Sequence, residues 1–156
     1  MEKSQLNFKE FFTESHKEFL QDAKKTMLKI PNSHKELVKN YKINPEGGNT
    51  LDGGHVGEID EKSKKIKIAS PWNYGRVFTF LHEIAHAVWK YVLDDNLKKQ
   101  WHSLYKKCKK QCPTGLDQGS EESFCMLYAQ HYAKNKLVKF DHPNKELDKF
   151  IANLPK

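Results

Sequence analysis

The most constraining feature of this chain is the segment 76–93, RVFTFLHEIAHAVWKYVL. No glycine or proline interrupts it, and its apolar side chains recur around the whole circumference of a helix with about 3.6 residues per turn. A helix on the surface of a domain would carry its apolar residues along one stripe only. The segment therefore predicts a helix that the rest of the domain encloses.

Two histidines and a glutamate lie in the middle of this apolar segment. His82 and His86 are four residues apart, so they share one helical face, and Glu83 is rotated by about 100° from His82. Burying such groups without partners costs a few kcal/mol each, and a divalent metal satisfies them together. The spacing is H-E-x-x-H, in which two imidazoles bind Zn²⁺ and the glutamate takes a proton from the metal-bound water. We expect His82 and His86 to bind zinc and Glu83 to be the general base; the alternative is a structural polar cluster.

A catalytic zinc needs a third protein ligand and an open position for water. Asp94 and Asp95 end the same helix, about 12 Å along its axis from His86, so they would need a sharp chain reversal. A separate helix that crosses the central one would bring in another ligand instead, and geometry alone does not choose among them. The downstream candidates are Asp94, Asp95, His102, Glu121, Glu122, His131 and His142.

The length of 156 residues predicts one domain over 1–156. The chain has no segment that resembles a signal peptide and no run of about 18 apolar residues. Its three cysteines, an odd number, fit a reducing compartment better than a disulfide framework. We therefore expect a cytoplasmic protein. The net charge of +7 permits acidic partners without demonstrating any.

The remaining elements follow from local patterns. Helical spacing predicts helices over 7–30, 96–111, 121–135 and 143–154, and a short helix or strand between 31 and 44. Residues 45–54 are rich in turn formers, and alternation predicts two short strands within 55–69. This hairpin could hold a substrate as an added strand or could simply cover the central helix. The lysines of 96–111 are typical of a solvated helix face rather than of a nucleic-acid site.

The run Ser120-Glu-Glu-Ser-Phe-Cys-Met-Leu-Tyr, after His82-Glu-Ile-Ala-His, resembles the glutamate-containing helix of the gluzincins. The resemblance is closest to the group related to the catalytic domain of anthrax lethal factor and the secreted Pro-Pro endopeptidases. Their pattern is E-x-F-A-x-x-[FY], and Glu122, Phe124 and Tyr128 match it, with Cys125 in place of alanine. The resemblance implies that Glu122, ahead of Glu121, is the third ligand. It extends to a glycine-led hairpin from residue 53 and a closing helix from residue 142, roughly the last two-thirds of the chain.

One departure concerns the oxyanion of the tetrahedral intermediate. The family places a tyrosine in the loop before the ligand glutamate, whereas the loop 113–119, PTGLDQG, has none. Another donor would have to replace it, because loss of such a donor costs on the order of 10²-fold in rate. The candidates are Tyr74, Tyr105, His102 and His131.

Together these observations predict an α+β, zincin-like fold, with an edge hairpin packed on a buried H-E-x-x-H helix and further helices. The expected activity is that of a zinc-dependent endopeptidase in which His82, His86 and Glu122 hold Zn²⁺. Glu83 would deprotonate the water and return the proton to the leaving amine. We expect a monomer that acts on a protein or peptide, without a membrane, and we do not expect nucleic-acid binding. Two alternatives stay open: an intracellular repressor-cleaving zinc peptidase, whose R-F-T-x-x-H-E-x-x-H-like pattern Arg76, Phe78 and Thr79 approximate, and a non-enzymatic protein with a structural metal.

Overall fold

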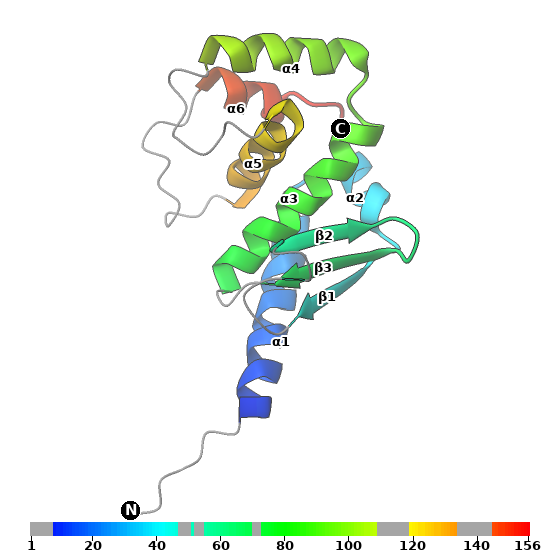
Figure 1. Ribbon diagram of the computed structural model, residues 1–156, viewed down its shortest axis with the longest axis vertical. Helices are drawn as coiled ribbons and strands as arrows, with labels where there is room; N and C mark the ends of the chain where they lie inside the picture. The colour runs from blue at the N-terminus through cyan, green and yellow to red at the C-terminus, as the bar shows by residue number, and fades with distance from the viewer. Residues whose placement is uncertain (1–7, 47–50, 52–54, 70–72, 109–118, 134–144) are drawn as a thin grey trace, which may run out of the picture.

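Helix α3 (Asn73–Tyr91) runs through the centre of the fold, in green in Figure 1. The computed structural model describes residues 8–46, 51, 55–69, 73–108, 119–133 and 145–156. Within these ranges the architecture is α+β, with six helices and a three-stranded mixed sheet, which confirms the expected α+β class. The other elements are α1 (Phe8–Met27), α2 (Asn32–Val38), β1 (Lys42–Glu46), β2 (Gly57–Asp60), β3 (Lys65–Ala69), α4 (Asp95–Cys108), α5 (Gly119–Ala133) and α6 (Lys145–Ala152).

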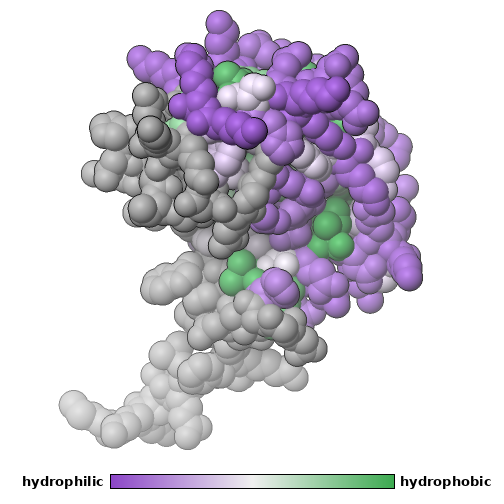
Figure 2. Space-filling model, turned by 45° about the horizontal axis from the view of Figure 1, so that its top comes forward, coloured by the Kyte–Doolittle hydropathy of each residue, from purple (hydrophilic) through white to green (hydrophobic). Residues whose placement is uncertain are grey.

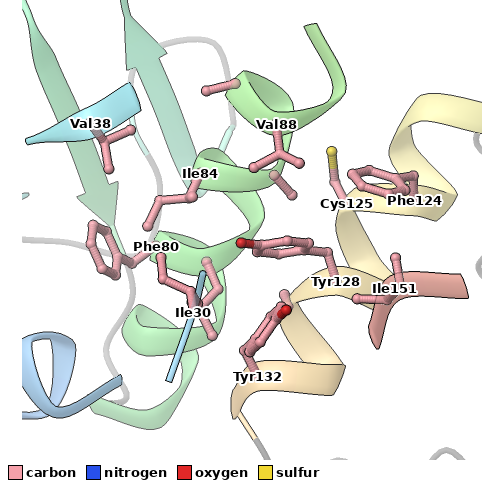
Figure 3. Close-up of a cluster of buried hydrophobic side chains, with 14 of the residues drawn as sticks. Ile30, Val38, Phe80, Ile84, Val88, Phe124, Cys125, Tyr128, Tyr132 and Ile151 are labelled. Carbon is pink, nitrogen blue, oxygen red and sulfur yellow. The ribbon is translucent and has the colours of Figure 1, made fainter. Parts of the chain in front are cut away.

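The middle of α3 is enclosed, as its apolar circumference predicts. It contacts α1 and α2, strands β2 and β3, and helix α5. Leu81, Ile84 and Val88 have no solvent-accessible surface. Figure 3 shows Ile84 and Val88 in the same buried cluster as Phe124 and Tyr128 of α5. The polar residues of the H-E-x-x-H segment therefore sit on a helix that has almost no solvated face in its central turns.

The sheet places a hairpin against this helix. Strand β3 lies in the middle, parallel to β1 and antiparallel to β2. Ile66 and Ile68 of β3 are fully buried, and β3 contacts α3. Asp60 stabilises the β2–β3 turn because its side chain accepts hydrogen bonds from the backbone N–H groups of Lys62 and Ser63, at 2.9 and 3.2 Å. The hairpin predicted within 55–69 is confirmed.

The segment before this hairpin differs from its prediction. Residues 31–44 contain both a helix, α2, and most of a strand, β1, where the sequence predicts one or the other. Strand β1 also includes Pro45 and Glu46, which the turn-rich composition assigns to a loop. Proline is accommodated because β1 is an edge strand, so one of its sides has no ladder hydrogen bonds to lose.

Helices α4, α5 and α6 form a second group beside α3. The fully buried Trp101 of α4 contacts Phe124 of α5 and Phe150 of α6, with ring centroids 5.4 and 5.3 Å apart. Lys99, Lys106 and Lys107 on α4 are exposed, and Figure 2, in which the α4 end comes forward, shows a mainly hydrophilic described surface. None of the helices in the described ranges combines the length and the hydrophobicity that crossing a membrane requires.

Candidate metal centre

The candidate centre lies where α3 faces the first turns of α5. His82 and His86 keep to one face of α3, with ring centroids 5.0 Å apart. Glu122 of α5 faces both imidazoles: its Oε2 is 3.1 Å from Nε2 of His82, and its Oε1 is 3.2 Å from Nε2 of His86. The structure thus brings together the three residues that the motif and the resemblance single out, with one nitrogen of each ring directed at the carboxylate.

Glu121, the other glutamate considered for the third ligand, lies on a different side of the pair. Its Oε1 is 2.9 Å from Nδ1 of His86, the ring nitrogen that does not face Glu122. Consecutive helical residues point about 100° apart, so the two carboxylates reach His86 from different directions. Glu121 therefore contacts the rim of the centre rather than the point where Nε2 of His82 and Nε2 of His86 converge.

Cys125 offers a second candidate for the third ligand, one turn after Glu122 on the same helix. Its Sγ and one ring nitrogen each from His82 and His86 all lie within 4.8 Å of one another. Burial, together with the nearby glutamate charges, raises the pKa of the Cys125 thiol far above its ordinary value, so the thiol keeps its proton unless a metal displaces it. Two imidazoles with either a carboxylate or a thiolate form a donor set that suits zinc. The residues present therefore fit that ion.

Glu83 lies beside this donor set and is almost completely buried. Burial raises the pKa of its carboxyl to about 7, an effect that the charge of His86 opposes. The backbone N–H of Ile59 in β2 donates a hydrogen bond to the carboxylate, which also favours the charged form. Strand β2 thus fixes the position of the expected general base.

A cleft of about 1090 Å³ is lined by His82, Glu83, His86, Glu121 and Glu122. The start of β2 and the two residues before it form one wall, with His55, Val56 and Gly57. Helices α3 and α5 supply the other histidines and the glutamates. Trp89 and Lys98 also line it. The cleft is large enough to hold an extended peptide segment rather than only a small molecule.

The remaining sequence candidates for the third ligand lie elsewhere. Those with described side chains do not line the cleft: Asp94, Asp95, His102 and His131. The carboxylate of Asp94 instead caps α4, where it accepts a hydrogen bond from the N–H of Leu97 at 2.8 Å. His131 pairs through Nδ1 with Asp148 of α6. His142 lies outside the described residues.

Three of the four side chains that the sequence suggests as oxyanion donors do not line the cleft. Tyr105 is buried away from the cleft, His102 and His131 do not line it, and the side chain of Tyr74 lies outside the described residues. Of the cleft-lining residues, His55 is exposed and carries a donor. Sequence reasoning named neither His55 as a donor candidate nor Cys125 as a ligand candidate. The spacing of Cys125, three residues after Glu122, was the available signal, whereas no local pattern marks His55.

Comparisons of this chain with protein-family models, with curated proteins and with solved structures found no match. The function of the centre therefore has to be argued from its own geometry and chemistry.

Proposed function

We propose that this protein is a zinc-dependent endopeptidase with a zincin-like fold. The observation that carries the proposal is that Nε2 of His82 and Nε2 of His86 both face the carboxylate of Glu122. The two nitrogen-to-oxygen distances are 3.1 Å for His82 and 3.2 Å for His86. Glu83 lines the same cleft. Two imidazoles, one carboxylate ligand and a separate buried carboxyl group form the set of roles that hydrolysis at a zinc site requires.

His82, His86 and Glu122 would hold the metal. When bound, zinc would polarise the scissile carbonyl and lower the pKa of a water molecule beside it. Glu83 lines the same cleft as these three residues, and its carboxylate would take a proton from that water and then deliver it to the leaving amine. Because Glu83 is nearly buried, its carboxylate acts in a place where bulk water does not compete for the proton.

The edge of β2 supports a peptide as the substrate. Ala69 of β3 donates its N–H to the carbonyl of Val56 at 2.8 Å, and the backbone groups of an antiparallel strand alternate in direction. Gly57 and Ile59 therefore direct their backbone groups away from β3. The N–H of Ile59 is taken by Glu83, so a peptide would pair with other backbone groups of this edge. An extended peptide that adds to this edge would lie along the cleft with its main chain next to the centre.

A second candidate function follows from Cys125. If the thiolate joins His82, His86 and Glu122, the metal has four protein ligands, and a closed tetrahedral site of this kind is structural rather than catalytic. The protein would then be a non-enzymatic metal-binding protein. The repressor-cleaving class stays a prediction from the pattern at Arg76, Phe78 and Thr79.

Elemental analysis and peptide cleavage together test the proposal. We expect about one zinc per chain in the wild type, its loss in Glu122→Gln, and its retention in Glu83→Gln. Wild-type protein should cleave members of a random peptide library, read by mass spectrometry, whereas Glu83→Gln should not. A protein that stays zinc-free after metal-replete purification would overturn the proposal, and a zinc-loaded protein without any cleavage would favour the structural site.

A further inference from the structure

The second acidic residue at the start of α5 has a role of its own. We propose that Glu121 is a positioning residue for His86: its carboxylate accepts the Nδ1–H of the ring and so directs the Nε2 lone pair toward the metal. This inference rests on the proposed zinc site. The observation is the 2.9 Å separation between Oε1 of Glu121 and Nδ1 of His86, while Nε2 of the same ring faces Glu122 at 3.2 Å.

With a metal between Nε2 and the Glu122 carboxylate, the chemistry of the two partners fixes the tautomer of His86. An ionised carboxylate can only accept hydrogen bonds, so contact with Glu121 requires the proton on Nδ1. A neutral imidazole has a single N–H, which leaves Nε2 with its lone pair free for a metal. A carboxylate on the second nitrogen also makes a histidine a more basic ligand and fixes the orientation of its ring.

The position of the two residues favours this division of roles. The His86 side chain is 24% exposed and that of Glu121 is 48% exposed, so the contact between Glu121 and Nδ1 lies at the rim of the centre. Glu122 reaches both rings at Nε2, whereas Glu121 reaches one ring at Nδ1. Two successive residues of α5 therefore supply the ligand and the group that orients a neighbouring ligand.

A simpler explanation of Glu121 is that an acidic residue in the first turn of a helix stabilises the helix dipole. The chain contains a matched case in Glu146, an exposed glutamate in the first turn of α6 whose carboxylate pairs with Lys107. The dipole explanation predicts similar, small effects of Glu121→Gln and Glu146→Gln on stability and no effect of either on metal affinity. The positioning role predicts an effect on metal affinity for Glu121 alone.

The test measures zinc affinity by competition with a chromogenic chelator. The proteins are the wild type, Glu121→Ala, Glu121→Gln, Glu122→Gln and Glu146→Gln. For Glu121→Ala we expect affinity about 10–100-fold weaker with the stoichiometry still near one. Glu121→Gln should lose less, because its amide oxygen can still accept the Nδ1–H, and Glu146→Gln should match the wild type.

A spectroscopic readout separates orientation from stability. In the zinc-loaded protein, the Nδ1–H proton of His86 should be shifted downfield and exchange slowly with water, and Glu121→Ala should shift it upfield and accelerate its exchange. Unchanged affinity together with an unchanged proton signal in Glu121→Ala would overturn the inference. Loss of stoichiometric zinc in Glu121→Gln but not in Glu122→Gln would also overturn it, because Glu121 would then be the ligand. Neither measurement depends on peptidase activity. A protein that binds zinc but cleaves no peptide would refute the endopeptidase proposal, and the zinc affinities would still decide the role of Glu121.

Discussion

Gly57 of β2 lies so close to Glu83 of α3 that no side chain fits between them. A Cβ added to Gly57 would be 2.5 Å from Oε1 of Glu83 and 2.5 Å from Cγ2 of Thr79. The same strand donates the N–H of Ile59 to the Glu83 carboxylate. Strand β2 and the Glu83 side chain therefore hold each other in place, so a substitution that moves one is expected to move the other.

Gly57→Ala tests this contact. The added methyl group must displace either β2 or the Glu83 carboxylate, because both atoms near it belong to the central turns of a buried helix. A misplacement of about 1 Å in a reacting group can cost about 10²-fold in rate. We expect kcat for peptide cleavage to fall by about that factor while zinc content stays near that of the wild type.

Lys62→Ala is the control for this variant, because its exposed side chain lies in the adjoining turn, away from Glu83. It should leave kcat unchanged. Wild-type kinetics in Gly57→Ala would show that Glu83 does not need its observed position against β2. Loss of zinc in Gly57→Ala would show a wider distortion of α3.

The central helix and its polar triplet could be predicted because their signal is local. A continuous apolar segment defines the burial of α3, and a four-residue spacing places His82 beside His86 without any knowledge of the rest of the fold. Glu122 was different: spacing alone left seven candidates, and a family pattern selected it. Its approach to both imidazoles depends on how α5 packs on α3, which no local pattern encodes.

The candidate residues that the sequence did not indicate are those whose place near the centre depends on how separate helices and strands pack together. Cys125 belongs to the apolar side of α5 and becomes a ligand candidate only because that side faces the histidines. His55 lies just before β2, and its place in the cleft depends on where the hairpin packs. The sequence did not predict that Pro45 belongs to a strand for a related reason. A strand accepts a proline when it lies at the edge of a sheet, and the order of strands cannot be read from the local sequence.

Cys125→Ala distinguishes the two metal-binding arrangements. If Glu122 completes the site, the variant should keep about one zinc per chain and its peptidase activity, and lose about 1 kcal/mol of unfolding free energy for the missing sulfur in a filled core. With Co²⁺ in place of zinc, the wild-type spectrum should lack a sulfur-to-metal charge-transfer band. Such a band, abolished in Cys125→Ala, would instead establish the thiolate as a ligand and support the structural site.

His55→Ala tests the cleft for the missing oxyanion donor. His55 is exposed and lines the cleft beside β2, where a substrate carbonyl would lie if the peptide adds to that edge. Removing a donor of this kind lowers kcat by on the order of 10²-fold with little change in metal content. His102→Ala, which alters an exposed histidine outside the cleft, should have wild-type kinetics. Equal activities of all three proteins would exclude His55 from this role.

His34 predicts a pH dependence of stability that has nothing to do with the metal. Its ring is fully buried, with Nε2 3.1 Å from the carbonyl oxygen of Pro155 and Nδ1 2.9 Å from the hydroxyl of Tyr128. The carbonyl can only accept, so Nε2 carries the proton and Nδ1 accepts the hydrogen bond from Tyr128. Burial raises the pKa of the Tyr128 hydroxyl, which therefore stays protonated over the whole relevant range.

Burial lowers the pKa of His34 below 6.5, and the hydrogen bond to Pro155 only partly opposes this shift. Below about pH 6.5, His34 therefore binds a proton in the unfolded chain but not in the folded protein. The free energy of unfolding consequently rises with pH through this window and falls as the pH is lowered. The slope from one such group is at most about 1.4 kcal/mol per pH unit. Urea unfolding between about pH 7.5 and pH 5, with a chelator present throughout, should show a steeper decline for the wild type than for His34→Gln, which cannot titrate. Parallel declines in the two proteins would mean that His34 is charged in the folded state and that its Nδ1 donates to the Tyr128 hydroxyl instead of accepting from it.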